Sequence, residues 1–351
     1  MSTRPAPTVA DLGERAIIDR IGSRAPSSSA FVTVGIGDDA AVLKAPRNLA
    51  EVVTTDVLVE GMHFDRSYVA PSAIGHKALA VNLSDLAAMG AEPRAALLSL
   101  VLPGSMTVAD FDEMIGGFLA LADRYRVSLV GGNVARSPGP LVVDVTAIGS
   151  VKPRRVLRRA GAKPGDGLYV SGSVGAAYAG FLASRRAALP AGSSGPGGVA
   201  GVGSDDMAAC VERFLRPDPR VRLGLLLGRN QVASAAVDLS DGLSDAVAQI
   251  AGASGVGAEI DGDAVPVPDE ARRWFSGQED RDPLEAALSG GEDYELLFTV
   301  PARKRRALGS VMRLLSGVPC TQIGRITADR RLVVLRGDER TPLPAGFAHF
   351  R

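Results

Sequence analysis

Five short acidic clusters, each next to a glycine or a hydroxyl residue, are spread along almost the whole chain. They occupy Gly35–Asp39, Thr54–Asp56, Asn82–Asp85, Asp238–Gly242 and Gly290–Asp293. If folding gathers several of these carboxylates, cations must accompany them, because two like charges about 4 Å apart repel by roughly 1 kcal/mol in water and roughly 4 kcal/mol at an effective dielectric constant of about 20. Mg²⁺ is held by one or two carboxylates together with phosphate oxygens. The clusters therefore indicate an enzyme that acts on nucleotide phosphates.

The composition is that of an ordinary globular protein of 351 residues, with 39 basic and 39 acidic side chains and 46% hydrophobic residues. This length favours two domains over one core. Charge balance argues against nucleic acid or an anionic membrane as partner. The N-terminus lacks the apolar stretch of a signal peptide and no 18-residue apolar run occurs, so we expect a cytoplasmic protein. Cys210 and Cys320 form neither a disulfide framework nor a zinc spacing.

Hydrophobic periodicity predicts helices and strands throughout both halves of the chain. In the first half, helices are expected at 8–22, 71–89 and 108–125, and strands at 32–34, 40–43, 52–55, 95–102 and 141–148. In the second half, strands are expected at 167–170, 235–237 and 295–300, and helices at 174–186, 218–229 and 243–253. The elements alternate without a strict βαβ period, which predicts a two-domain α+β or α/β fold with mixed sheets. We expect domains at 1–150 and 151–351.

The stretch near 187–205 is rich in Gly, Ser and Pro and cannot bury a core. We expect a flexible surface insertion in the second domain, with a mobile lid as the alternative.

The loop Gly35–Ala40 fits the relaxed dinucleotide fingerprint G-x-G-x-x-A, but a strand-like run follows where that fingerprint requires a helix. Two carboxylates would also repel a bare pyrophosphate. With a cation between them, the glycines allow close backbone approach and an aspartate holds an ion that bridges to phosphate. The alternative is an ordinary Asp-Asp turn.

The other acidic clusters lie at the ends of predicted strands or within an apolar helix. Thr54–Asp56 offers two hydroxyls and a carboxylate, which suit Mg²⁺ and equally suit a cap. Asp85 interrupts an apolar helical run, where a carboxylate seldom lacks a functional partner. Asp238 and Asp241 follow a strand at the end where α/β ligand sites form, although a helix cap is the alternative. Glu292 lies in a similar glycine turn before a strand.

His63, Arg158 and Arg159 are further polar candidates. A structural role is the default for His63, whereas the arginines suit phosphate oxygens or a solvated surface. No Walker A sequence, protein-kinase catalytic loop or Gly-x-Ser-x-Gly elbow occurs in the chain. The commonest kinase and hydrolase classes are therefore excluded.

Taken in order, these motifs make the chain resemble the thiamine-monophosphate kinase family of the aminoimidazole-ribonucleotide-synthetase-like superfamily. The matching segments are 35–43, 54–64, 77–103, 158–175, 235–245 and 289–301. The resemblance implies an N-terminal domain whose strands pair with a second subunit, a C-terminal α/β domain, and ATP bound between the two. It also implies a homodimer that uses several Mg²⁺ ions, with ATP as co-substrate and thiamine monophosphate as acceptor.

The resemblance also implies roles for individual residues, matched by position. The implied magnesium ligands are Asp39, Thr54, Thr55, Asp56, Asp85, Asn133, Asp238 and Asp241. The implied ATP contacts are Tyr125, a turn at Gly131 and Gly132, Arg159 and Ser240. The implied thiamine phosphate contacts are His63, Glu292 and Phe347, whose aromatic face suits a cationic thiazolium.

Two positions depart from the family pattern. Asn133 and Val134 stand where the family usually has Asp-Thr, and Ala176 and Ala177 stand where Asp-Ser is common. An Asn carbonyl can still bind Mg²⁺, so weaker binding of one ion is expected rather than loss of activity.

The implied reaction is in-line transfer of the γ-phosphoryl group of ATP to the phosphate of thiamine monophosphate, without a general base. Rival interpretations are another ATP-dependent enzyme of the superfamily and a binding-only relative. No cysteine precedes Cys210, which disfavours a selenophosphate synthetase, and the chain lacks the C-terminal cysteine of a hydrogenase maturation factor. The fit of the His63 and Glu292 segments disfavours aminoimidazole ribonucleotide synthetase.

Overall fold

The computed structural model of the chain describes residues 6–25, 29–189, 207–277, 282–315 and 317–347. Most of the insertion predicted near 187–205 lies outside these residues. The chain divides into two compact units, residues 1–86 with 92–152, and residues 87–91 with 153–351. The predicted boundary at 150 falls close to this division, while the functions assigned to the two domains stay predictions. Among the described residues, no helix has the length and apolar character needed to cross a membrane.

The first unit is built on a four-stranded mixed sheet with the order β3-β6-β4-β5. Its strands are β3 (Ala50–Val59), β4 (Glu92–Pro103), β5 (Ser128–Ser137) and β6 (Val142–Val151). Strands β4 and β5 are parallel, and the other two pairs are antiparallel. Two short strands, β1 (Val32–Val34) and β2 (Val42–Leu43), form a separate hairpin-like pair.

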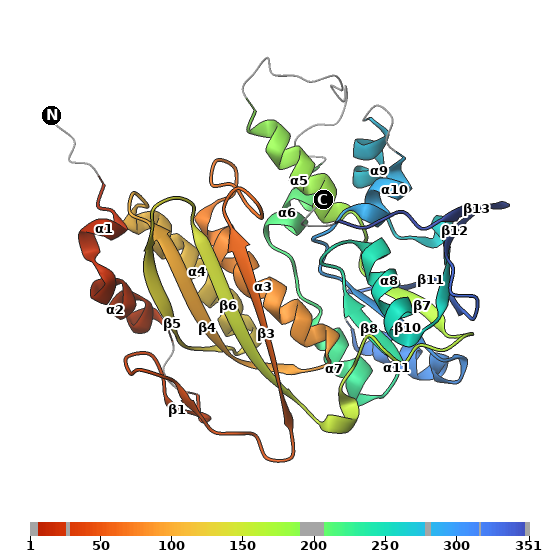
Figure 1. Ribbon diagram of the computed structural model, residues 1–351, viewed down its shortest axis with the longest axis horizontal. Coiled ribbons are helices and arrows are strands. Elements are labelled where there is room, and N and C mark those ends of the chain that lie inside the picture. The colour runs from red at the N-terminus through yellow and green to blue at the C-terminus, as the bar shows by residue number, and fades with distance from the viewer. Residues whose placement is uncertain (1–5, 26–28, 190–206, 278–281, 316, 348–351) are drawn as a thin grey trace. The chain divides into compact units, whose positions relative to one another are not determined.

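Helices α3 (Pro71–Ala88) and α4 (Val108–Tyr125) cover one face of the four-stranded sheet (Figure 1). The two helices approach closely because glycine occupies the contact on each of them. A Cβ on Gly75 would lie 1.8 Å from the Met114 carbonyl oxygen, and one on Gly117 would lie 1.9 Å from that of Ser72. Large side chains are therefore excluded from this contact, which places α3 firmly over the sheet.

The N-terminal helical segment is two helices, α1 (Val9–Leu12) and α2 (Glu14–Arg24), so the prediction of one helix at 8–22 is wrong in this detail. Gly13 separates them with a φ of 78°, a left-handed conformation that breaks the helical path.

The predicted turn at Gly131 and Gly132 is also wrong, because both residues lie inside strand β5. A Cβ on Gly132 would lie 1.8 Å from the Leu98 carbonyl oxygen of β4. The glycine pair thus marks a close approach between two strands beside a register shift, and not a chain reversal.

The second unit holds a seven-stranded mixed sheet with the order β13-β12-β9-β11-β7-β10-β8. Its strands are β7 (Gly167–Ser171), β8 (Ala235–Asp238), β9 (Gly257–Asp261), β10 (Leu296–Val300), β11 (Cys320–Thr327), β12 (Leu332–Arg336) and β13 (Glu339–Pro342). Only the β12–β9 pair of this sheet is parallel. The mixed α/β character predicted for this half is confirmed.

Seven helices and three short 3₁₀ turns in the described part of the second unit accompany this sheet. The helices are α5 (Ala176–Ala187), α6 (Ala208–Leu215), α7 (Val221–Arg229), α8 (Leu243–Ser254), α9 (Asp269–Ser276), α10 (Pro283–Ser289) and α11 (Arg305–Leu314). The 3₁₀ turns are η1 (Pro153–Arg155), η3 (Gly262–Ala264) and η4 (Ala302–Lys304).

A fully buried carboxylate, Glu295, ties the strands of the second unit to its helices. It accepts hydrogen bonds from Arg220 at 2.6 Å to each oxygen, from Ser171 at 2.6 Å, and from Arg213. Two guanidinium groups and a hydroxyl therefore compensate one buried negative charge. Arg213 belongs to α6 and Arg220 precedes α7, so this single group orients both helices against β7 and β10.

Replacing Glu295 with Gln should lower the free energy of unfolding by about 3–5 kcal/mol, because two half-buried arginines lose their counter-charge. Urea unfolding followed by circular dichroism measures this change. Asp338→Asn in the β12–β13 turn is the control, since it alters an exposed carboxylate and should leave the unfolding midpoint nearly unchanged. Equal midpoints for the two variants would contradict the role given to Glu295.

Candidate functional site

In the first unit, one strand and one helix bring three of the predicted site residues together. Alternation along β3 places the side chains of Thr54 and Asp56 on the same face. The Thr54 hydroxyl donates a hydrogen bond to Oδ2 of Asp85 on α3, so this face of β3 is directed at α3. The structure thus joins Asp85, which interrupts an apolar helix, to Thr54 in the middle of a strand, 31 residues earlier.

The carboxylate of Asp56 is not compensated by the described part of the protein. Its Oδ2 is buried and has no hydrogen-bond partner among the described residues. Burial, followed by the negative charges of Asp85 and Asp144, raises the pKa of Asp56 to about 7. No cationic side chain is among the causes of this shift. A hard cation fits this position, because it would supply the missing partner and offset the repulsion between the acids.

Thr55 lies on the opposite face of β3 from Thr54 and Asp56. Its Oγ1 is 3.1 Å from Asp144 Oδ1, from the Val145 carbonyl oxygen and from Thr146 Oγ1. The side chains of Thr54, Thr55 and Asp56 therefore do not form a single ligand set. The predicted role of Thr55 in metal binding stays a prediction.

Two other predicted metal ligands of the first unit, Asp39 and Asn133, belong to segments other than β3 and α3, which carry Asp56 and Asp85. Asp39 is exposed in the loop after β1, where its backbone N–H donates to Asp38 Oδ1 at 2.9 Å. Asn133 is exposed on β5 and is paired in register with Ser99, whose other neighbour is Asp144. Across the described residues, no group of three or more His, Cys, Asp or Glu side chains is placed to hold a metal ion.

His63 lies in the tight turn that follows β3. The Val59 N–H donates to His63 Nδ1 at 3.1 Å, so Nδ1 is an acceptor and the neutral ring carries its proton on Nε2. Glu60 fixes the same turn by accepting from Arg66 Nε at 2.7 Å and from the Leu141 N–H at 2.9 Å. The sequence alone assigns Glu60 no role, because its partner Leu141, just before β6, is 81 residues away.

Tyr125 is the last residue of α4, and the guanidinium carbon of Arg124 lies 5.2 Å from its ring centroid. Strand β5 begins three residues later and contains Gly131 and Gly132. The predicted ATP contacts of the first unit therefore lie at a helix end and along an edge strand.

In the second unit, the two acidic motifs meet at the end of β8. Asp238 is the last residue of β8 and is only 5% exposed. Beyond the strands, the Glu292 N–H donates to the Ser240 carbonyl at 2.7 Å, and the Tyr294 N–H donates to that of Leu239 at 2.9 Å. A Cβ on Gly291 would lie 2.4 Å from the Ser240 carbonyl oxygen. The glycine thus permits a close backbone contact that sets Ser240 next to Glu292.

Asp293 is adjacent to Glu292 but has a different role. Its buried carboxylate accepts from the Gly175 N–H at 2.6 Å and from the Ala177 N–H at 3.0 Å, at the start of α5. Burial raises the pKa of Asp293 to about 7, and these two hydrogen bonds oppose the shift. Asp293 is therefore an internal helix cap, which sequence reasoning missed because α5 lies more than 100 residues earlier.

The chain returns to this region near its end. The Phe347 N–H donates to the Asp241 carbonyl at 3.3 Å, and Phe347 is 55% exposed. Arg159 is exposed and follows Arg158, whose carbonyl accepts from Ala236 N–H of β8 at 2.8 Å. The second unit therefore gathers five predicted site residues around the end of β8, namely Asp238, Ser240, Asp241, Glu292 and Phe347, whereas Arg159 follows a residue that pairs with the interior of this strand.

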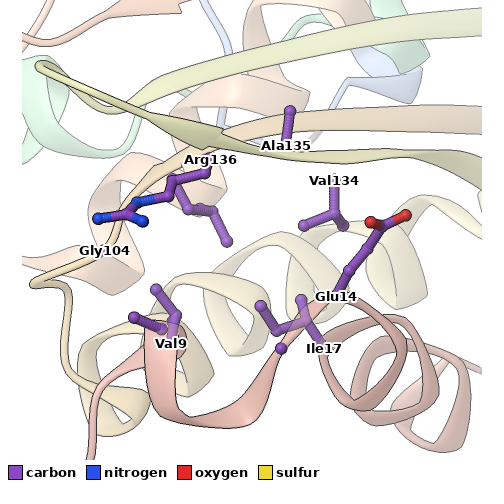
Figure 2. Close-up of a pocket in the computed structure, with 10 residues that line it drawn as sticks. Val9, Glu14, Ile17, Gly104, Val134, Ala135 and Arg136 are labelled. Atoms are coloured by element: carbon purple, nitrogen blue, oxygen red, sulfur yellow. The ribbon is translucent and has the colours of Figure 1, made fainter.

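A pocket of about 240 Å³ lies in the first unit between the N-terminal helices and β5 (Figure 2). Val9, Ile17 and Val134 provide apolar walls, while the side chains of Glu14 and Arg136 lie at separate positions along its lining. None of the predicted site residues lines it. The pocket is therefore not part of the acidic site described above.

Comparisons with known proteins give matches over both units. Residues 37–151 match the family described as AIR synthase related protein, N-terminal domain, and residues 163–336 match AIR synthase related protein, C-terminal domain. The thiamine-monophosphate kinase of Salmonella typhimurium is 42% identical over 317 residues, which cover 90% of this chain and 91% of that protein.

Two solved structures are also similar to this chain. The crystal structure of thiamine-monophosphate kinase from Stenotrophomonas maltophilia K279a has a TM-score of 0.78 and 40% identity, covering 91% of this chain and 95% of that one. The structure of AaThiL complexed with AMPPCP and TMP has a TM-score of 0.73 and 32% identity, covering 100% of both chains.

Asp56 should make the stability of the metal-free protein depend on pH. Because its folded pKa of about 7 exceeds the ordinary value of 3.8, the folded state keeps a proton that the unfolded state loses between these two values. Stability should therefore fall as pH rises from about 4 to about 7. Asp56→Asn cannot ionise, so it should show a flatter profile and greater stability than the unchanged protein at pH 8.

Urea unfolding in EDTA at pH 5, 6, 7 and 8 tests this expectation. Asp123→Asn, which alters an exposed carboxylate on α4, should keep the profile of the unchanged protein. A profile for Asp56→Asn as steep as that of this control would show that Asp56 is already compensated.

Proposed function

Since this chain belongs to the thiamine-monophosphate kinase family, we propose that it transfers the γ-phosphoryl group of ATP to the phosphate of thiamine monophosphate. The products are thiamine diphosphate and ADP. One observation in the chain itself carries the proposal: the buried, uncompensated oxygen of Asp56 beside Asp85, on a strand and a helix that face each other. A site of this kind suits a cation that accompanies phosphate groups.

In this proposal, each unit supplies oxygen ligands for Mg²⁺. Asp56, Asp85 and Thr54 supply them in the first unit, and Asp238 and Asp241 supply them in the second. Asp39, Thr55 and Asn133 are the remaining proposed ligands. When bound, Mg²⁺ neutralises the charge of the transferred phosphoryl group and of its leaving oxygen.

ATP contacts are assigned to exposed or half-buried groups of each unit. Tyr125 provides a ring, Gly131 and Gly132 provide a strand without side chains, and Arg159 provides a guanidinium suited to phosphate oxygens. Ser240 lies at the end of β8, where its hydroxyl can face a nucleotide. The close backbone contact at Gly291 supports this placement, because it fixes the position of the Ser240 carbonyl group.

Thiamine monophosphate is assigned to His63, Glu292 and Phe347. His63 has its Nδ1 engaged by the Val59 N–H, so Nε2 is the nitrogen that can donate to a phosphate oxygen. Phe347 is 55% exposed and its backbone N–H is bonded to the Asp241 carbonyl, and an aromatic ring at this position suits the cationic thiazolium.

The chain's own residues act by positioning. The acceptor phosphate is already anionic at neutral pH, so no general base is required and none is assigned. Tightly packed helices hold Asp85, and a strand end holds Asp238, so the reacting oxygens can be kept in line at little cost during the reaction. The main alternative, a binding-only relative, is suggested by the neutral residues Asn133 and Ala176.

A homodimer is also proposed, formed through the four-stranded sheet. Two apolar residues on the face of β3 opposite Asp56 support it: Val53 is 62% exposed and Val57 is 47% exposed. A cytoplasmic location is proposed as well.

Asp85→Ala and Asp238→Ala should each reduce turnover by about 100-fold or more while leaving the fold intact, because each removes a proposed magnesium ligand. A coupled assay for ADP release, with and without thiamine monophosphate, measures the effect. Asp123→Ala on α4 and Asp338→Ala in the β12–β13 turn are exposed controls, one in each unit. ATP binding without substrate-dependent ADP release in the unchanged protein would instead establish the binding-only relative.

Phe347→Leu should raise KM for thiamine monophosphate roughly 3- to 30-fold, because it removes a cation–π contact worth about 0.5–2 kcal/mol. Phe347→Tyr retains the aromatic face and should keep KM within a few-fold. KM for ATP serves as the internal control and should not change. A Leu variant with an unaltered KM for thiamine monophosphate would place the thiazolium elsewhere.

A further inference from the structure

Asn82 on α3 is a fully buried polar residue with an unused oxygen. Its side chain is 0% exposed, and its Nδ2 donates to the Ala78 carbonyl of the preceding helical turn at 3.1 Å. This hydrogen bond identifies the nitrogen end of the amide, so the other end is Oδ1. Oδ1 is buried and has no hydrogen-bond partner among the described residues.

The position of Asn82 directs it to the same layer as Asp85. The two residues are three apart on α3 and therefore lie on the same helix face. That face is directed at β3, because Asp85 accepts the hydrogen bond of Thr54.

The course of the chain places Asn82 nearer to Asp56 than to Thr54. Helix α3 follows β3 after the connection at 60–70 and runs back along the sheet (Figure 1). Going back from Asp85 to Asn82 moves about 4.5 Å towards the start of α3. This is the direction in which β3 advances by about 6.6 Å from Thr54 to Asp56.

Asp56 Oδ2 and Asn82 Oδ1 thus belong to the same layer between β3 and α3, and each lacks a hydrogen-bond donor among the described residues. Both are hydrogen-bond acceptors, so neither can satisfy the other while Asp56 is ionised. Buried acceptors are almost always partnered in folded proteins. A cation satisfies both oxygens at once, and a neutral amide adds no charge repulsion to the two carboxylates.

We propose that Asn82 supplies a further oxygen, Oδ1, to the cation held by Asp56 and Asp85. This inference rests on the proposed function, in which Mg²⁺ occupies that position. The hydrogen bond from Nδ2 to Ala78 orients the amide, so its oxygen is presented to the metal without rearrangement of the helix.

Asn82→Leu tests the proposal, because leucine has a similar size and no polar atom. A buried acceptor with no partner is itself unfavourable, so the metal-free variant should be as stable as the unchanged protein or more stable. The MgCl₂ concentration that gives half of the rise in Tm, without nucleotide, should increase about tenfold or more. The concentration that half-saturates ADP release should increase in parallel.

Two further variants keep the test decisive. Asn82→Asp retains an oxygen at this position and should preserve or strengthen the Mg²⁺-dependent rise in Tm, even if the Leu variant does not fold. Asn230→Leu removes the same type of hydrogen bond, from a side-chain amide to the carbonyl four residues earlier. Because Asn230 is exposed and lies on the second unit, this variant should leave the response to Mg²⁺ unchanged.

An Asn82→Leu variant with an unaltered response to Mg²⁺, or an Asn82→Asp variant that loses it, would overturn the role of Asn82. The Tm titration uses Mg²⁺ alone and does not depend on turnover. Absence of ADP release in the unchanged protein would therefore refute the proposed function while leaving the metal titration to decide the role of Asn82.

Discussion

The interaction on which the first unit depends is the repulsion between carboxylates that its own groups leave uncompensated. Asp56 is drawn into the layer between β3 and α3, where burial and two neighbouring acids raise its pKa to about 7. A protein under selection for stability alone would place an apolar residue there, since an unsatisfied buried acceptor costs about 1–3 kcal/mol. Its presence is understandable if a cation completes the layer. The close contact of α3 with α4 matters here, because the glycine contacts hold α3 in place and so keep Asp85 near Asp56 despite their repulsion.

Sequence patterns anticipated the parts of this site that local chemistry determines. Asp85 was identified because a carboxylate inside an apolar helical run is expensive without a partner, and the structure gives it the Thr54 hydroxyl as one. Thr54 and Asp56 lie on one face of β3 and Thr55 on the other, because successive side chains of a strand point to opposite faces. The prediction of one ligand set rested on residue type alone and did not include this alternation. The shared layer of Asn82 and Asp56 depends on how α3 packs, which spacing along the chain does not specify.

Other features depended on contacts between distant segments and were beyond local patterns. Gly131 and Gly132 have the composition of a turn, but the neighbouring β4 backbone is what requires glycine there. Strand β5 was therefore overlooked, although β7, β8 and β10 were predicted close to their observed bounds. Asp293 and Glu292 are adjacent acids with the same sequence signal. Only the position of α5 shows that Asp293 caps a helix.

The acids of the chain can be sorted by what compensates them, and this separates structural from functional carboxylates. Glu295 is neutralised by two arginines and a hydroxyl, and Asp293 is held by two backbone N–H groups, so each is complete within the protein. Asp56 is equally withdrawn from water at Oδ2 but has other acids, and no described donor, around it. Burial alone therefore does not indicate function, since all three carboxylates are buried in part or in full. What distinguishes Asp56 is that no donor among the described residues compensates its Oδ2, which is the condition under which a bound cation would complete the site.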